Sequence, residues 1–119
     1  MTVNIAAATS IVGHTIVGEI TTSLDEVLDN QSATELVKVN SIVIINDNGS
    51  NSATVSATIS DAGGTGDIDI AKTIPVPAGT NLVLISADMR IYLTQDKAIN
   101  LQASASSHLN YCISYEVIS

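Results

Sequence analysis

The sequence contains few aromatic and few cationic residues. Its 119 residues include three Tyr, no Phe and no Trp, and its four cations stand against twelve acids, for a formal net charge of −8. Four dispersed cations cannot neutralise a run of phosphates, so we expect no nucleic-acid partner. An anionic membrane would repel the chain, so we expect no membrane partner either.

Cysteine is also scarce, because Cys112 is the only one. A single cysteine excludes an intrachain disulfide and a cysteine-based metal cage. We interpret Cys112 as a half-buried strand residue, since a strand is a poor place to lower the pKa of a thiol. The N-terminal residues carry no basic segment, and Ala6 to Ala8 is too short for a signal or a membrane span. We therefore expect a protein that is made in a cytoplasm and remains soluble or assembles.

Recognisable catalytic motifs are missing as well. His14 lies among apolar residues and His108 lies in a Ser-rich turn far away in sequence, so a structural or solvated role is favoured for both. The acids are scattered, mostly at turns. We expect no enzyme activity, no catalytic residue, no cofactor and no metal. An acyl hydrolase that pairs a Ser with His14 or His108 is the weakest hypothesis, because it requires both groups within hydrogen-bond reach.

Two polar loops could be mistaken for ion sites. Residues 46–51 (NDNGSN) favour a hairpin turn over a calcium loop, because the EF-hand spacing and its closing Glu are absent. Residues 61–67 (DAGGTGD) lack the pattern of a dinucleotide-binding loop. Asp61, Asp67 and Asp69 could bind Ca²⁺ together, but a solvated acidic strand edge explains them without an ion.

The residues that are abundant predict β-strands. The 45% apolar fraction consists mostly of Ile, Val, Leu and Ala, which suit sheets packed face to face. Apolar and polar residues alternate through 98–104 and 109–118, as in antiparallel strands that face water on one side. We predict an all-β, antiparallel sandwich or jelly-roll-like domain over residues 11–119, with about eight to ten short strands, preceded by an extended arm over residues 1–10.

The early part of the chain is harder to assign. Residues 11–24 read as one or two strands with a bend or bulge at a glycine. Residues 25–34 read as a loop with one helical turn, because Ser23 and Glu26 have the spacing of a capping box.

Two strands provide candidates for an interface. Residues 36–45 are apolar on both faces in their second half, which marks a central strand or a strand covered by a partner subunit. Residues 52–60 alternate small apolar residues with a ladder of hydroxyls. The interface candidates are Leu36, Ile42, Ile44, Thr54, Ser56 and Thr58. A closed assembly, expected to be a homotrimer, would bury the outer face of residues 36–45.

The three tyrosines offer one alternative. Tyr92, Tyr111 and Tyr115 could line a sugar-binding face, although Tyr111 and Tyr115 fall on the apolar side of their strand and favour core packing. A carbohydrate-binding module used in host attachment is therefore the second hypothesis, and it predicts an exposed Tyr92 beside acidic loops.

The order of the segments from residue 36 to residue 119 resembles that of small virion structural proteins of tailed bacteriophages. The resemblance is carried by 39–46 (VNSIVIIN), 53–55 (ATV), 74–80 (IPVPAGT), 91–93 (IYL), 94–96 (TQD) and 114–118 (SYEVI). Gln95 stands where that family more often has Gly, which leaves the turn type open. The resemblance implies a β-sandwich present in many copies on a capsid, neck or tail. Its partners would be other virion proteins and itself, and its location the virion.

Overall fold

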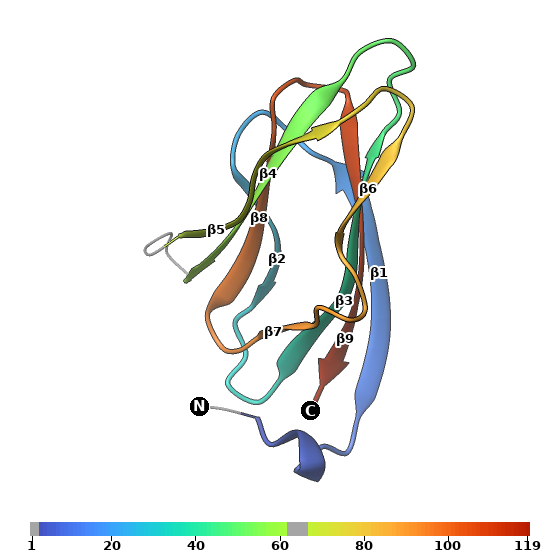
Figure 1. Cartoon of the computed structure of the whole chain (residues 1–119). Coiled ribbons are helices and arrows are strands. Elements are labelled where there is room, and N and C mark those ends of the chain that lie inside the picture. Colours follow the sequence, from blue (N-terminus) through green and yellow to red (C-terminus); the bar gives the residue numbers. More distant parts are fainter. Residues whose placement is uncertain (1–2, 62–66) are drawn as a thin grey trace.

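The structure is a computed structural model that describes residues 3–61 and 67–119. The described residues form nine β-strands and one 3₁₀ turn, η1 (Figure 1). The elements are η1 Ile5–Ala7, β1 Ile11–Glu19, β2 Asp25–Asn30, β3 Leu36–Asn46, β4 Ala53–Asp61, β5 Ile68–Val76, β6 Asn81–Ile85, β7 Ile91–Leu93, β8 Lys97–Ala103 and β9 Leu109–Ile118.

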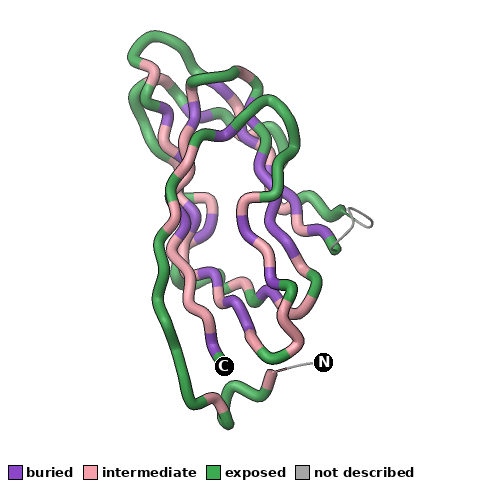
Figure 2. The backbone as a smooth tube through the Cα atoms, turned by 180° about the vertical axis from the view of Figure 1, so that it is seen from behind, coloured by how far each residue is buried: buried purple, intermediate pink, exposed green. Residues whose placement is uncertain are grey.

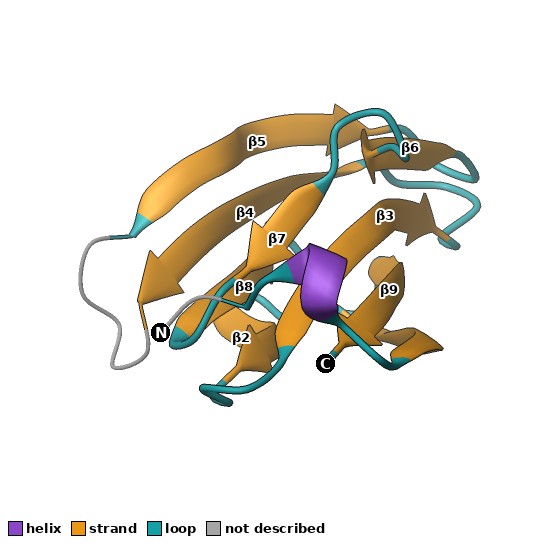
Figure 3. Cartoon of the chain, turned by 90° about the horizontal axis from the view of Figure 1, so that it is seen from below, coloured by secondary structure: helices purple, strands orange, loops and turns teal. Residues whose placement is uncertain are grey.

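The strands form two antiparallel sheets that pack face to face (Figure 3). The five-stranded sheet has the order β1-β9-β3-β6, and β7 pairs with β3 beside β6. The four-stranded sheet has the order β2-β8-β4-β5. The predicted all-β antiparallel sandwich is therefore confirmed, and the strand count falls within the predicted range.

The core between the sheets is aliphatic. Val39, Ile42 and Ile44 of β3 are fully buried against residues of the other sheet such as Val55 and Leu101. Removal of each such side chain from water contributes about 1.5–3 kcal/mol. Figure 2 shows buried segments on strands of both sheets.

The structure corrects the assignment of residues 25–34. Residues 25–30 are the strand β2 and not part of a loop with a helical turn, and they pair with β8. Leu28 and Asn30 are buried, so the packing of alternate residues against the core outweighs the local capping pattern.

The expected bend in the first segment is also absent, because β1 pairs with β9 in one unbroken register. Gly18 instead makes room for an aromatic ring. A Cβ atom at this position would lie 2.7 Å from the Tyr111 hydroxyl oxygen.

The segment before β1 is attached to the other end of the chain. The N–H groups of Thr9 and Ser10 donate to the Ser119 carbonyl at 2.8 and 2.9 Å, and the Ser119 N–H donates to the Ser10 carbonyl at 2.9 Å. The predicted boundary between an arm and a domain at residue 10 stays a prediction.

A buried asparagine side chain stands at the end of β3. The Asn46 amide donates to the carbonyls of Asn51 and Val76 at 3.0 and 2.9 Å, and its Oδ1 accepts from the Asn48 N–H at 3.0 Å. Its backbone N–H donates to the Thr80 carbonyl at 2.8 Å. Asn46 thus joins the β3–β4 and β5–β6 connections, both of which pass between the sheets.

Asn30 repeats this arrangement at the other end of the sandwich. Its amide donates to the carbonyls of Glu35 and Leu93 at 2.9 and 2.8 Å, and its Oδ1 accepts from the Ser32 N–H at 3.0 Å. Its backbone carbonyl accepts from the Asp96 N–H at 2.7 Å. The β2–β3 and β7–β8 connections are joined in this way.

We expect Asn46→Ala to lower the free energy of unfolding by about 2–4 kcal/mol, because it leaves buried carbonyls without donors. Urea unfolding measures the loss. The matched control is Asn110→Ala, because the Asn110 amide donates to Asp47 at the surface. This control should change stability by about 0.5 kcal/mol or less. Equal losses in the two variants would contradict the role of Asn46.

Candidate assembly surface

A row of apolar side chains crosses the outer face of the five-stranded sheet. Val17 of β1 is paired with Cys112 of β9, Cys112 with Val43 of β3, and Val43 with Val83 of β6. Directly paired residues of antiparallel strands project from the same face. Core residues such as Ile113 occupy the alternate positions, so this set faces away from the core. We call these four residues the outer apolar row.

The outer apolar row is accessible in the isolated chain. Val17 is 71% exposed and Val83 is 56% exposed, while Val43 and Cys112 are half-buried. On one side the row is bordered by Thr15, Ser114 and Ser41, which are paired across the same three strands and carry no charge. An exposed apolar strip with a neutral polar border is typical of a contact surface between proteins.

Two of the predicted interface residues do not lie on the outer face of the sheet. Ile42 and Ile44 are fully buried between the sheets, and a partner subunit could reach them only if the sandwich opened. The outward positions of the same strand are Val43 and Ile45, so these two residues replace Ile42 and Ile44 as the side chains of β3 that a partner can contact. Leu36 is also buried, outside the main core, where it is paired with Ile118.

The predicted hydroxyl ladder lies on the outer face of the four-stranded sheet. Thr54 and Ser56 are half-buried, and the Ser56 hydroxyl accepts from the Thr73 N–H at 2.9 Å. Thr58 is buried, and its hydroxyl accepts from the Asn100 amide at 3.1 Å. Part of the ladder is thus already bonded within the chain, and its role in an interface stays a prediction.

The three tyrosines differ in burial, as the sequence predicts. Tyr111 and Tyr115 pack against the core, and His14 stacks on the Tyr115 ring with centroids 5.2 Å apart. Tyr92 is 41% exposed, and the residue paired with it on β3 is Lys38. Tyr92 alone therefore presents its ring to solvent.

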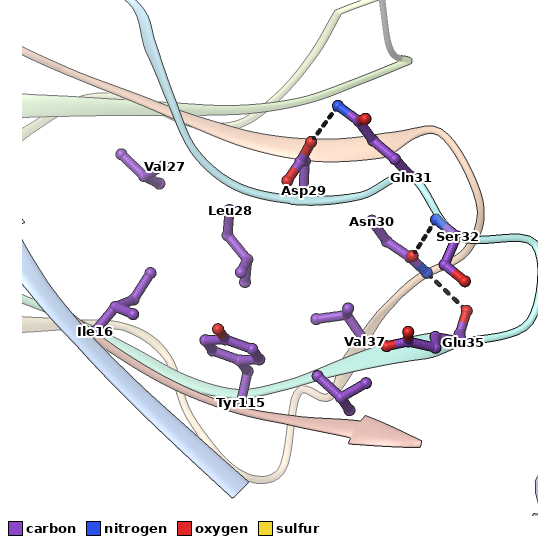
Figure 4. Close-up of a pocket in the computed structure, with 11 residues that line it drawn as sticks. Ile16, Val27, Leu28, Asp29, Asn30, Gln31, Ser32, Glu35, Val37 and Tyr115 are labelled. Atoms are coloured by element: carbon purple, nitrogen blue, oxygen red, sulfur yellow. Dashed lines mark hydrogen bonds between the residues drawn. The ribbon is translucent and has the colours of Figure 1, made fainter. Parts of the chain in front are cut away.

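A cavity of about 530 Å³ opens between β2 and the five-stranded sheet (Figure 4). Ile16, Leu28 and Tyr115 are among its apolar lining residues. Three of its polar lining residues are already bonded within the chain, since Gln31 donates to Asp29 at 2.8 Å and the Asn30 side chain bonds to three backbone groups. The outer apolar row is therefore the better candidate for function.

The proposed acidic ion site receives no support from the described residues. Asp61 forms an ion pair with Lys97. No group of three or more His, Cys, Asp or Glu side chains with metal-binding geometry occurs within 3–61 and 67–119. The glycine-rich residues 62–66 lie outside the described residues.

The hydrolase hypothesis requires a hydrogen bond between a Ser hydroxyl and a His ring, and the described residues contain none. The Nδ1 atom of His108 lies 2.7 Å from the Ser106 backbone carbonyl. No seryl hydroxyl hydrogen bonds to His14 or His108 among the residues that the structure describes.

One carboxyl group has a shifted pKa. Partial desolvation, then the negative charge of Asp29 and a hydrogen bond to it, raises the pKa of Glu26 above its ordinary value. The folded chain therefore holds this proton more tightly than the unfolded chain does. Ionisation of Glu26 costs stability, and the cost develops as the pH rises from the ordinary value through the raised folded value.

We expect Glu26→Gln to stabilise the protein at pH 7 and to have less effect at pH 4, because Gln carries no charge to be desolvated or repelled. Since Glu26 is exposed, the gain should stay below about 0.5 kcal/mol. Thermal unfolding at both pH values measures it. The same change in an Asp29→Asn background should give a smaller gain, and an equal gain at both pH values would contradict the assignment.

Comparison with known proteins bears on the fold. No protein-family model matches the sequence, and no curated protein matches it. A protein of Bacillus endospore appendages, which form disulfide-linked pili, has a TM-score of 0.50 and 13% identity, with 92% of this chain and 88% of that chain covered. At this identity the likeness shows a shared β-fold and nothing further.

A structure of infectious bursal disease virus, strain Gx, also matches, with a TM-score of 0.47 and 16% identity. The match covers 92% of this chain and 32% of that chain, so the chain spans about a third of the viral one.

Within the described residues, none of the helices reaches the length and apolarity that a membrane crossing demands.

Proposed function

We propose that this chain is a non-enzymatic structural component of a tailed-phage virion, which assembles on the capsid surface as a decoration protein or at the neck or tail. The outer apolar row is the observation that carries this proposal. Four strands about 4.8 Å apart give the row a length of about 15 Å. A strip of this length, with an uncharged border at Thr15, Ser114 and Ser41 and one acid, Glu19, on the opposite border, suits burial against another protein surface.

The charge distribution supports the same surface. Several acids of the four-stranded sheet, such as Glu26, Asp29 and Asp69, lie away from the outer apolar row, on strands of the other sheet. With a net charge of −8, a copy of this chain or another acidic virion protein is repelled least at the outer apolar row.

The proposed partners are other virion proteins and further copies of this chain. The order of segments over residues 36–119 resembles tailed-phage virion proteins, and a protein with a similar fold forms pili. The homotrimer expected from the sequence belongs to this proposal, with Val43 and Ile45 as the outward-facing residues of β3 that it would bury.

The proposal predicts that a charge in the outer apolar row prevents incorporation into particles. Val83→Asp should lower the amount of chain that cosediments with the tailed-phage particles at least about 30-fold, because it buries an unpaired carboxylate. Electron microscopy of particles made with and without the chain should show the corresponding density. The matched control is Gln102→Glu, which adds a charge at an exposed position on the outer face of the other sheet and should bind as the wild type does.

Cys112 provides a second readout, because it is the only thiol and lies within the outer apolar row. A maleimide should label it in the free chain and should label it much more slowly in particles. Equal labelling in both states, or particles without this chain, would contradict the proposal.

The second candidate function is carbohydrate binding, which the exposed ring of Tyr92 favours. Glu116 is paired with Lys38, and Lys38 with Tyr92, so an aromatic face has hydrogen-bonding neighbours on the same face of the sheet. This function predicts binding on a glycan array that Tyr92→Ala abolishes. A glycan array without binding would remove it.

A further inference from the structure

The strand β1 has an unpaired edge. It is nine residues long and pairs with β9 on one side, while it forms the end of the five-stranded sheet on the other. Figure 2 shows it as an exposed segment along one side of the molecule. Large apolar side chains point from both of its faces, including Ile11 and Val17 from one and Val12 from the other.

The register identifies which backbone groups are free. Ser10 and Ser119 exchange two hydrogen bonds, and the Ile20 N–H donates to the Leu109 carbonyl at 2.9 Å. Between these points the register is unbroken, so the even-numbered residues of β1 bond to β9. The odd-numbered residues direct their N–H and C=O groups away from β9. These residues are Ile11, Gly13, Thr15, Val17 and Glu19.

The other edges among the described residues carry features that discourage pairing. β5 contains Pro75 and Lys72 and has register shifts, and β2 has three acids and a register shift. β6 and β7 have only five and three residues. β1 has no Pro, no Lys and no bulge. Natural proteins protect or cover such an edge, so the bare state of β1 indicates that another strand covers it.

The charge of β1 favours a second copy of this chain as that strand. Its one acid, Glu19, stands at one end of the strand, and its Oε1 accepts from the Ser107 N–H at 3.0 Å. In an antiparallel pair of identical strands, the two Glu19 side chains lie at opposite ends, about 25 Å apart, where salt screens their repulsion.

The sequence of β1 is complementary to itself in one register. If two copies pair antiparallel with Thr15 opposite Thr15, all nine residues pair and every odd-numbered residue faces an odd-numbered residue. The free groups then form about ten backbone hydrogen bonds. Val17 lies opposite Gly13, where nothing lies within 4 Å of a Cβ position. Val12 lies opposite Gly18, where the Tyr111 ring already occupies that position.

We propose that two copies of this chain associate through β1, antiparallel and centred on Thr15, so that two five-stranded sheets become one continuous sheet. The contact is two-fold and closes on itself. It differs from the contact at the outer apolar row, and it depends on the proposed function only for its role in a particle.

The test combines mass and cross-linking. Thr15→Pro removes a free N–H at the centre of the edge without removing a bond to β9, so it should weaken dimers at least about 30-fold in sedimentation, whereas Thr15→Ala should not. In a Cys112→Ser background, Thr15→Cys should form a disulfide between copies, because a hydrogen-bonded antiparallel pair brings the Cα atoms to about 5.5 Å. Gln102→Cys, at an exposed position on the outer face of the other sheet, should form no such disulfide in the same background.

Each outcome decides the proposal. A disulfide at position 15 supports it even if Thr15→Pro fails to fold. A monomer at micromolar concentration, or a trimer without this disulfide, would overturn it. Dimers that do not enter particles would refute the proposed function and leave this contact standing, whereas particle binding by a chain that does not pair at β1 would do the reverse.

Discussion

Two buried asparagine side chains hold the sandwich closed, and the positions of all its outer surfaces depend on them. Asn46 and Asn30 lie at the ends of β3 and β2, and each amide bonds to one carbonyl of the opposite sheet and to one carbonyl of the connection that follows its own strand. Where the chain leaves one sheet and enters the other, some backbone carbonyl groups lose the hydrogen bonds that strand pairing would give them. One amide supplies two donors and one acceptor, which suits such a crossing.

The two asparagines form hydrogen bonds with backbone groups at four of the connections between the sheets, so β3 is fixed at both ends. The inner side chains of β3 then fill the core, and its outer side chains are held in line with those of β9 and β6. The outer face of the five-stranded sheet carries the outer apolar row together with Glu19, Lys38 and Glu116, and the outer face of the four-stranded sheet carries acids and hydroxyls.

Strands could be predicted from the sequence where polar and apolar residues strictly alternate, as in β8, β9 and the hydroxyl ladder of β4. The prediction failed at β2, because the burial of Leu28 and Asn30 depends on contacts that the local sequence does not contain. The faces of β3 were ambiguous because a bulge lies between Val39 and Ser41 and residues 42–45 are all apolar. The outer apolar row joins residues from four distant segments, so only the register of the sheet could bring Val17, Val43 and Val83 together.

The hydrogen-bonded pair of Ser10 and Ser119 places both described ends of the chain at one pole of the sandwich (Figure 1). A mechanical load applied between those ends would open β1 from β9 one rung at a time, which resists force weakly. A load carried across the sheet would instead have to shear many rungs at once. The strength of this molecule therefore depends on the direction of pull.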